Sequence, residues 1–101
     1  MNAMGATRAI PAGYLTLEGP FFAAHREEVL GFVMARVARA RTEQPTRRVI
    51  GLRCGPRGTH VTIADAHLAR DIAIALQAAF EGDMDLVYGG EENLIRATWS
   101  R

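Results

Sequence analysis

Lysine is absent from this chain of 101 residues, and cysteine occurs once, as Cys54. Without lysine, the chain cannot hold the G-x-x-x-x-G-K-[ST] loop with which P-loop proteins bind nucleotide phosphates. One thiol forms neither an internal disulfide nor a cysteine-based metal site, so a reducing compartment, the cytoplasm, is expected. The fully apolar runs are only a few residues long, so no membrane-spanning helix is predicted.

The remaining composition is typical of one globular domain. Hydrophobic residues make up 49% of the chain and charged residues 23%, which is unlike disordered or fibrous proteins. A chain of this length can bury one core but is too short for two domains. The opening segment, MNAMGATRAIPAG, lacks the apolar core of a secretory signal. We therefore expect a poorly ordered leader over residues 1–13 and a single domain over residues 14–101.

Hydrophobic spacing predicts two helices. In residues 22–42, apolar side chains recur every three or four positions, as on one face of a helix, and Gln44-Pro45 ends the segment. Asp65 is the expected N-cap of a second helix, and Gly82 is the expected residue just beyond its C-terminus. The apolar positions are Val29, Phe32, Val33, Val37 and Ala40 in the first helix, and Leu68, Ile72, Leu76, Ala79 and Phe80 in the second.

Alternation of apolar and polar residues predicts two hairpins. In the first, a Gly-Pro-Arg-Gly turn joins two short runs that are apolar at every second position. The second hairpin closes the chain and contains its single tryptophan. The expected strands cover residues 50–54, 59–63, 84–88 and 95–99, and the expected turns cover residues 55–58 and 89–93.

These elements follow the order helix, hairpin, helix, hairpin. A short extended segment, residues 14–17, precedes them and ends at Gly19-Pro20. Each expected strand has one apolar face, which suits a sheet covered on one side. The predicted fold is therefore α+β, a two-layer sandwich with two helices on a four-stranded, largely antiparallel sheet. The two helix–hairpin halves have similar lengths, which suggests a structural repeat, and the strand order is left open.

Three histidines raise the question of a metal site. His25 and His67 fall near the starts of different helices, and His60 falls on a strand position that faces away from the core. None has a second histidine three or four residues along, the spacing of a helical zinc site. Surface histidines are the simpler interpretation, and neither a metal nor another cofactor is expected.

Cys54 and a group of acids are the remaining candidates for catalysis. Cys54 alternates with Leu52, which predicts a buried thiol, whereas a nucleophile needs access and a neighbouring base. Paired carboxylates can act as acid and base or bind a divalent cation. Solvated charges that protect a sheet edge are the simpler explanation, with Asp85 paired across the strands to Arg96. No catalytic residue is assigned; the acids concerned are Asp83, Asp85, Glu91 and Glu92.

Arginine supplies all twelve basic side chains. A GC-rich genome explains such a content, so only the placement of the arginines is informative. Residues 36–57 carry seven arginines and one acid, whereas residues 58–101 carry three arginines and seven acids. If the seven converge on one rim, they can bind a polyanion such as RNA, although no aromatic residue lies among them to stack on a base. The candidate polyanion-binding residues are Arg36, Arg39, Arg41, Arg47, Arg48, Arg53 and Arg57.

Three strings of sequence carry a resemblance to a known group of proteins. They are LEGPFFAAHREE at residues 17–28, DAHLAR at residues 65–70 and ENLIRATW at residues 92–99. Together they resemble the C-terminal part of small bacterial proteins that have an N-terminal zinc ribbon and no established function. The resemblance covers roughly residues 14–101 and implies an accessory or adaptor domain linked to RNA or protein partners. This chain has no C-x-x-C pair, so the zinc-binding part of that pattern is absent from it.

The sequence therefore favours a small cytoplasmic interaction domain without enzymatic activity. Its partner is expected to be another protein, or a second copy of itself bound through a sheet edge or an exposed helix face. The alternative is binding of RNA or another polyanion through the arginine-rich rim. An enzyme that uses Cys54 or the acids is the third interpretation, and neither a small-molecule substrate nor a membrane is expected to bind.

Overall fold

A computed structural model describes residues 10–89 and 94–101, which form five strands and three helices. The α+β class predicted from the sequence is confirmed, with a sheet of five strands instead of four and with three helices instead of two. In chain order, the elements are β1 (Gly13–Glu18), α1 (Pro20–Ala24), α2 (Arg26–Glu43), β2 (Val49–Cys54), β3 (Gly58–Ile63), α3 (Ala66–Phe80), β4 (Asp83–Gly89) and β5 (Leu94–Ser100).

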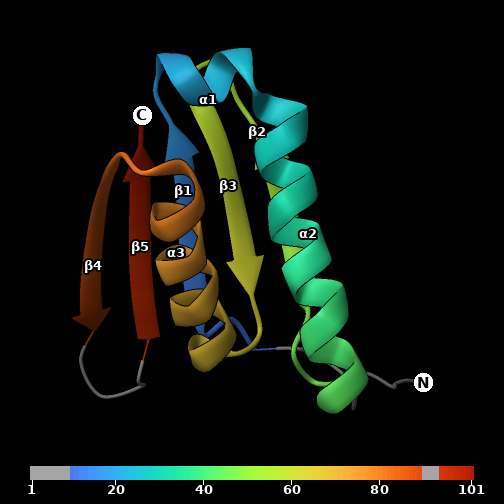
Figure 1. The fold of residues 1–101 in the computed structure, drawn as a ribbon. Coiled ribbons are helices and arrows are strands. Elements are labelled where there is room, and N and C mark those ends of the chain that lie inside the picture. The colour runs from blue at the N-terminus through green and yellow to red at the C-terminus, as the bar shows by residue number, and fades with distance from the viewer. Residues whose placement is uncertain (1–9, 90–93) are drawn as a thin grey trace.

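The five strands form one sheet in the order β2-β3-β1-β5-β4. β1 runs antiparallel to β3 and parallel to β5, and the two outer pairs, β2 with β3 and β4 with β5, are antiparallel. β1, α2 and β2 form a split β-α-β unit, because β3 lies between the two parallel strands. The helices α2 and α3 lie over one face of the sheet, and α1 lies at the end where β1 and β5 finish (Figure 1).

The additional strand is β1, the middle strand of the sheet. Its alternation is regular, since Gly13, Leu15 and Leu17 are buried while Tyr14 and Thr16 are half-buried. The prediction recognised residues 14–17 as extended but gave them no place in the sheet. Their partners β3 and β5 lie far along the chain, so no local turn signal marks the pairing.

The predicted first helix over residues 22–42 is divided at His25 into α1 and α2. The backbone of His25 leaves the helical region, at φ −122° and ψ 31°. Its N–H contacts the carbonyl oxygens of Phe21 and Phe22 at 2.9 and 3.1 Å, which closes α1. At the other end of α1, the N–H groups of Phe21 and Phe22 donate to the backbone oxygen of Arg101 at 2.6 and 3.1 Å. These bonds tie the short helix to the end of β5.

The sequence signals around α3 are confirmed. The Asp65 side chain caps the helix by accepting from the N–H groups of His67 and Leu68 at 2.7 and 3.3 Å. Gly82 lies just past the C-cap with φ +92°, a conformation that favours glycine. β4 and β5 pair as the second hairpin, while the predicted turn at residues 90–93 and residues 1–9 of the predicted leader lie outside the described residues.

The core lies between the sheet and the helices. Phe22, Val29 and Val33 from α1 and α2 meet Ile72 and Leu76 of α3 over the buried side chains of the strands. Trp99 of β5 is fully buried, and its indole N–H donates to the Glu81 carbonyl at 2.6 Å. None of the helices formed by residues 10–89 and 94–101 is long and apolar enough to cross a lipid bilayer.

Candidate functional site

The side of the sheet opposite the helices is uncovered within the described residues, and we call it the bare face. Paired residues on neighbouring strands point to the same side of a sheet, so this face is organised in rows that cross all the strands. The middle row, from β2 to β4, is Arg53, His60, Thr16, Thr98 and Asp85, and the row beside it is Gly51, Thr62, Tyr14, Arg96 and Val87.

Two contacts organise the centre of the bare face. The guanidinium of Arg96 lies over the ring of Tyr14, 4.7 Å from the ring centroid. The Thr16 hydroxyl and Nδ1 of His60 lie 3.2 Å apart, within hydrogen-bond distance. A shallow basin of about 630 Å³ opens beside them and is lined by Tyr14, Gly51, Leu52, Arg53, His60 and Thr62.

Charge on the bare face is separated between its two edges. Arg53 lies on β2, and Arg57 lies in the turn that follows β2. Asp83 and Asp85 lie on β4, in the same rows as that turn and Arg53. Arg96 and Glu18 lie between the edges, so one edge is basic, the other is acidic, and the middle carries one charge of each sign.

The two edges of the sheet also differ in the side chains that they expose. β4 carries Asp83 and Asp85, and charged side chains on an edge strand oppose pairing with another strand. β2 instead exposes Leu52, which is 46% accessible, and Cys54. β4 also exposes Val87 and Tyr88, so each edge combines charged and apolar side chains.

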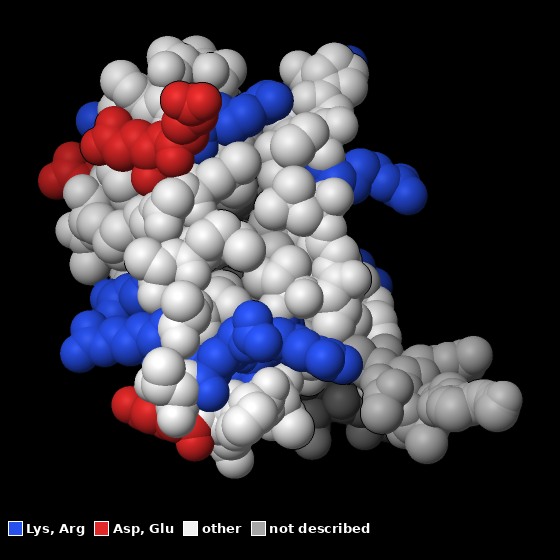
Figure 2. Space-filling view, turned by 90° about the vertical axis from the view of Figure 1, so that its right-hand side faces the viewer, with Lys and Arg blue, Asp and Glu red and all other residues white. Residues whose placement is uncertain are grey.

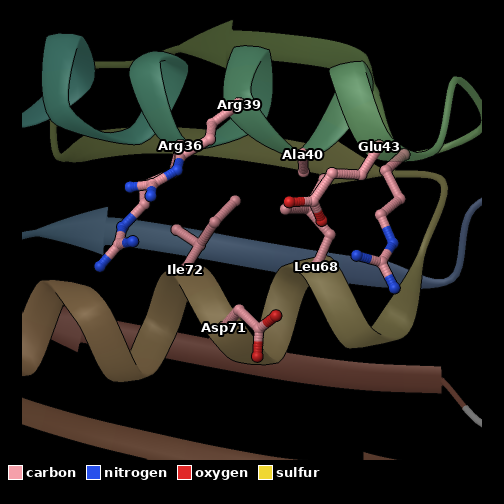
Figure 3. Close-up of a pocket in the computed structure, with 8 residues that line it drawn as sticks. Arg36, Arg39, Ala40, Glu43, Leu68, Asp71 and Ile72 are labelled. Carbon is pink, nitrogen blue, oxygen red and sulfur yellow. The ribbon is translucent and has the colours of Figure 1, made fainter.

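Three of the seven predicted polyanion-binding arginines gather in one place. Arg36, Arg39 and Arg47 line a hollow of about 160 Å³ between α2 and α3, and they share it with Glu43 and Asp71. Figure 3 shows Arg36 and Arg39 reaching from α2 toward α3. The Arg36 guanidinium also lies 5.5 Å from the Phe32 ring centroid.

The other four arginines lie apart from this hollow. Arg41 follows Arg39 by two residues and so points to the opposite side of α2. Arg48 is exposed just before β2, while Arg53 belongs to the bare face. Arg57 lies past the far end of β2, a strand of six residues that spans about 20 Å. Seen from the α2 side, the basic side chains form separate groups with uncharged surface between them (Figure 2).

Cys54 is exposed, so the prediction that its thiol is buried is wrong. The register behind that prediction is right, because Cys54 and Leu52 pair with the buried residues Thr59 and Val61. Both side chains nevertheless remain accessible, since β2 is the outermost strand and lies at the margin of the helical layer. The Thr59 hydroxyl donates to the Cys54 sulfur at 3.7 Å, whereas His60 points to the opposite face.

The histidines and acids stay apart. His60 is exposed on the bare face as predicted, His67 is exposed near the start of α3, and the His25 ring packs 4.1 Å from the Phe21 ring. Over residues 10–89 and 94–101, no three histidine, cysteine or carboxylate side chains gather as metal ligands would. Asp85 lies opposite Thr98, so its predicted pairing with Arg96 is wrong; Glu91 and Glu92 lie outside the described residues.

Sequence reasoning missed the position of Tyr14 beside Arg96. It found no aromatic residue among the arginines, because Tyr14 is distant from them in sequence. The pairing of β1 with β5 and β3 places Tyr14 between Arg96 and Thr62, with Arg53 two strands away. The polar positions of residues 13–18 were the available signal, since Tyr14 and Thr16 alternate with buried residues.

Comparison with protein-family models, with curated proteins and with solved structures found no match. The resemblance to the C-terminal part of zinc-ribbon proteins therefore stays a prediction.

Proposed function

We propose that this protein is a small cytoplasmic interaction module without enzymatic activity, which binds a protein partner or a second copy of itself through the bare face. The observation that carries the proposal is the one-sided cover of the sheet. α2 and α3 bury one face, while the opposite face presents side chains from all five strands. The adaptor role implied by the sequence resemblance agrees with this proposal.

The chemistry of the bare face supports a protein partner. Tyr14 lies at its centre with Arg96 stacked on it, and tyrosine and arginine are enriched where protein interfaces gain most of their energy. Thr16, Thr62 and Thr98 surround them with hydroxyl groups that both donate and accept hydrogen bonds.

Site-specific photo-crosslinking tests the proposal. A photoreactive residue is placed at Thr62, on the bare face, or at Gln77, an exposed position on α3 that serves as the matched control. The proposal predicts a discrete protein adduct from position 62 and none from position 77 when the producing cells are irradiated. Equal labelling from both positions, or no adduct from position 62, contradicts it.

The second candidate function is binding of RNA or another polyanion at the hollow between α2 and α3. Arg36 and Arg39 favour it, because no carboxylate of the described residues lies within 4.0 Å of either guanidinium. Arg47 contributes less, since its Nε donates to Asp65 at 3.0 Å. Glu43 and Asp71 in the same hollow oppose an anion, so this function ranks second.

A further inference from the structure

We propose that the occupant of the bare face is a second copy of this chain, stacked face to face about a two-fold axis that runs along β1. The inference rests on the proposed function, because it names the partner of the same surface. It is drawn from the position of charges in the sheet.

The symmetry of the sheet makes its charges self-complementary. β1 is the middle strand, with two strands on each side. A two-fold axis along β1 lays the β2 side of one copy over the β4 side of the other and keeps each row opposite itself. Arg53 then faces Asp85 of the second copy, and Asp85 faces the second copy's Arg53. Stacked sheets lie about 10 Å apart, a gap that an arginine and an aspartate can bridge together.

The row that contains Glu18 and Asp83 adds to the charge complementarity between the two copies. Gly58, which directly follows Arg57, lies in the row of Asp83, because Gly58 pairs with Glu18, Glu18 with Ser100 and Ser100 with Asp83. The same axis therefore brings the turn that contains Arg57 over Asp83 of the second copy. The Arg53–Asp85 pair occurs twice, and in each copy the turn that contains Arg57 lies near Asp83 of the other.

Other arrangements bring like charges together. A two-fold axis across the strands lays β4 over β4 and reverses the order of the rows, so Asp85 faces either its own copy or Asp83 of the second copy. A direct pairing of the two β4 edges also brings acids together. Like charges set opposite one another across an interface repel, and proteins use this repulsion to exclude wrong partners. The charges therefore select the axis along β1. A polyanion suits the face less well than a second copy, because Glu18, Asp83 and Asp85 repel it.

The centre of the face matches this arrangement too. Tyr14 and Thr16 lie on the axis, so each meets its own copy at the middle of the interface. Aromatic residues at the centre and charged residues at the rim are the usual anatomy of protein interfaces. Tyr14 is already held by Arg96, so it loses little freedom on binding.

The area of the bare face sets the expected affinity of the dimer. Five strands about 4.8 Å apart and about 20 Å long present roughly 500 Å² per copy, or about 1,000 Å² in total. This value is at the lower limit for specific interfaces. We therefore expect a reversible dimer whose population depends on concentration, with dissociation in the micromolar range.

Two charges near the axis oppose the arrangement, the Arg96 guanidinium, which lies over the Tyr14 ring, and Glu18. Glu18 lies at the end of β1, on the axis, so the two Glu18 carboxylates approach each other. Glu18→Gln removes this repulsion while it keeps the shape of the side chain. The proposal predicts a dimer about two- to tenfold tighter in this variant.

Analytical ultracentrifugation of the full chain tests the proposal through charge exchange. Arg53→Asp and Asp85→Arg each place like charges at both edges, so each should weaken the dimer by about tenfold or more. An equimolar mixture of the two variants should form a heterodimer about as tight as the original dimer, because every Arg–Asp pair is restored. Arg70→Asp and Glu28→Arg change the charge equally at exposed positions on α3 and α2, off the bare face, and should leave the dimer unchanged.

A measurement on the unaltered chain guards against variants that do not fold. Raising the salt from roughly 50 to 500 mM should weaken the dimer several-fold, because the rim pairs are screened. The proposal is overturned if mixing the two variants restores nothing, if salt has no effect, or if Leu52→Lys abolishes the dimer while Arg53→Asp does not, since that result assigns pairing to the β2 edge.

A monomer at every concentration also overturns the proposal. The crosslink at position 62 then shows whether only self-pairing fails or the proposed interaction function fails as well. A discrete adduct with a different protein leaves the interaction role standing without self-pairing. If no adduct forms at all, the proposed function fails together with the dimer.

Discussion

Arg47 and Asp65 form an ion pair that joins two segments of the fold. The Arg47 Nε donates to Oδ2 of Asp65 at 3.0 Å, while Oδ1 of the same carboxylate accepts from the backbone N–H groups of His67 and Leu68. Both side chains are largely shielded, with 26% and 18% of their surfaces accessible. One carboxylate thus caps α3 and holds the segment that leads into β2.

Replacement of Asp65 should therefore destabilise the fold, and two variants separate the contribution of the helix cap from that of the ion pair. Asp65→Ala removes both the cap and the ion pair and should cost about 1–3 kcal/mol. Asp65→Asn keeps a capping oxygen and loses only the charge, which should cost about 1 kcal/mol or less. Urea unfolding followed through Trp99 fluorescence measures both. Asp71→Ala, an exposed acid of α3 that caps no helix, is the control, and an equal loss in Asp71→Ala and Asp65→Ala would contradict the assignment.

Two glycine-to-alanine substitutions should change stability in opposite directions. Gly82 has φ +92°, and an added Cβ would lie 2.9 Å from the Ser100 carbonyl oxygen, so Gly82→Ala should cost more than about 1 kcal/mol. Gly31 lies within α2 with nothing within 4 Å of an added Cβ, so Gly31→Ala should stabilise the fold by about 0.5–1 kcal/mol. Thermal unfolding of both variants shows whether Gly82→Ala lowers the melting temperature and Gly31→Ala raises it. A stabilised Gly82→Ala would show that the turn before β4 is assigned wrongly.

Cys54 should react promptly with a thiol reagent in the folded protein. Its side chain is exposed on the outermost strand, on the side of the sheet away from the bare face. Labelling should therefore proceed at a rate within about tenfold of that in denaturant, where the thiol is fully accessible. Cys54→Ser provides the unlabelled control. Labelling that requires unfolding would mean that the thiol is buried after all.

The second candidate function makes its own prediction about salt. If the hollow between α2 and α3 binds RNA, Arg36→Gln and Arg39→Gln should each weaken binding and lower the slope of log K against log salt by about one. Arg41→Gln, on the opposite side of α2, is the matched control. Fluorescence anisotropy with a labelled mixed-sequence RNA measures the slope. Absence of binding at roughly 50 mM salt would remove this function.

Local signals in the sequence predicted the elements that depend on near neighbours. Asp65 and Gly82 delimit α3 as expected, because a cap acts within a few residues of its own position. The break at His25 was missed, since the bonds that hold α1 reach Arg101 at the other end of the chain.

The bare face could not be predicted for the same physical reason. Its rows arise from pairings of β1 with β3 and β5, which join residues 40 to 82 positions apart. The sequence showed each charge but not its row, so Arg53 was grouped with the arginines of α2 and Asp85 was paired with Arg96. Only the strand order sets Arg53 and Asp85 at opposite edges of one row.

The most direct test of the central claim is a concentration series of the backbone amide spectrum of the unaltered protein by nuclear magnetic resonance. If the bare face pairs with a second copy, the signals that move with concentration belong to Tyr14, Thr16, His60, Thr62 and Thr98, while those of α2 and α3 stay fixed. Movement confined to Val49–Cys54, or a spectrum that does not change with concentration, would contradict self-pairing through this face.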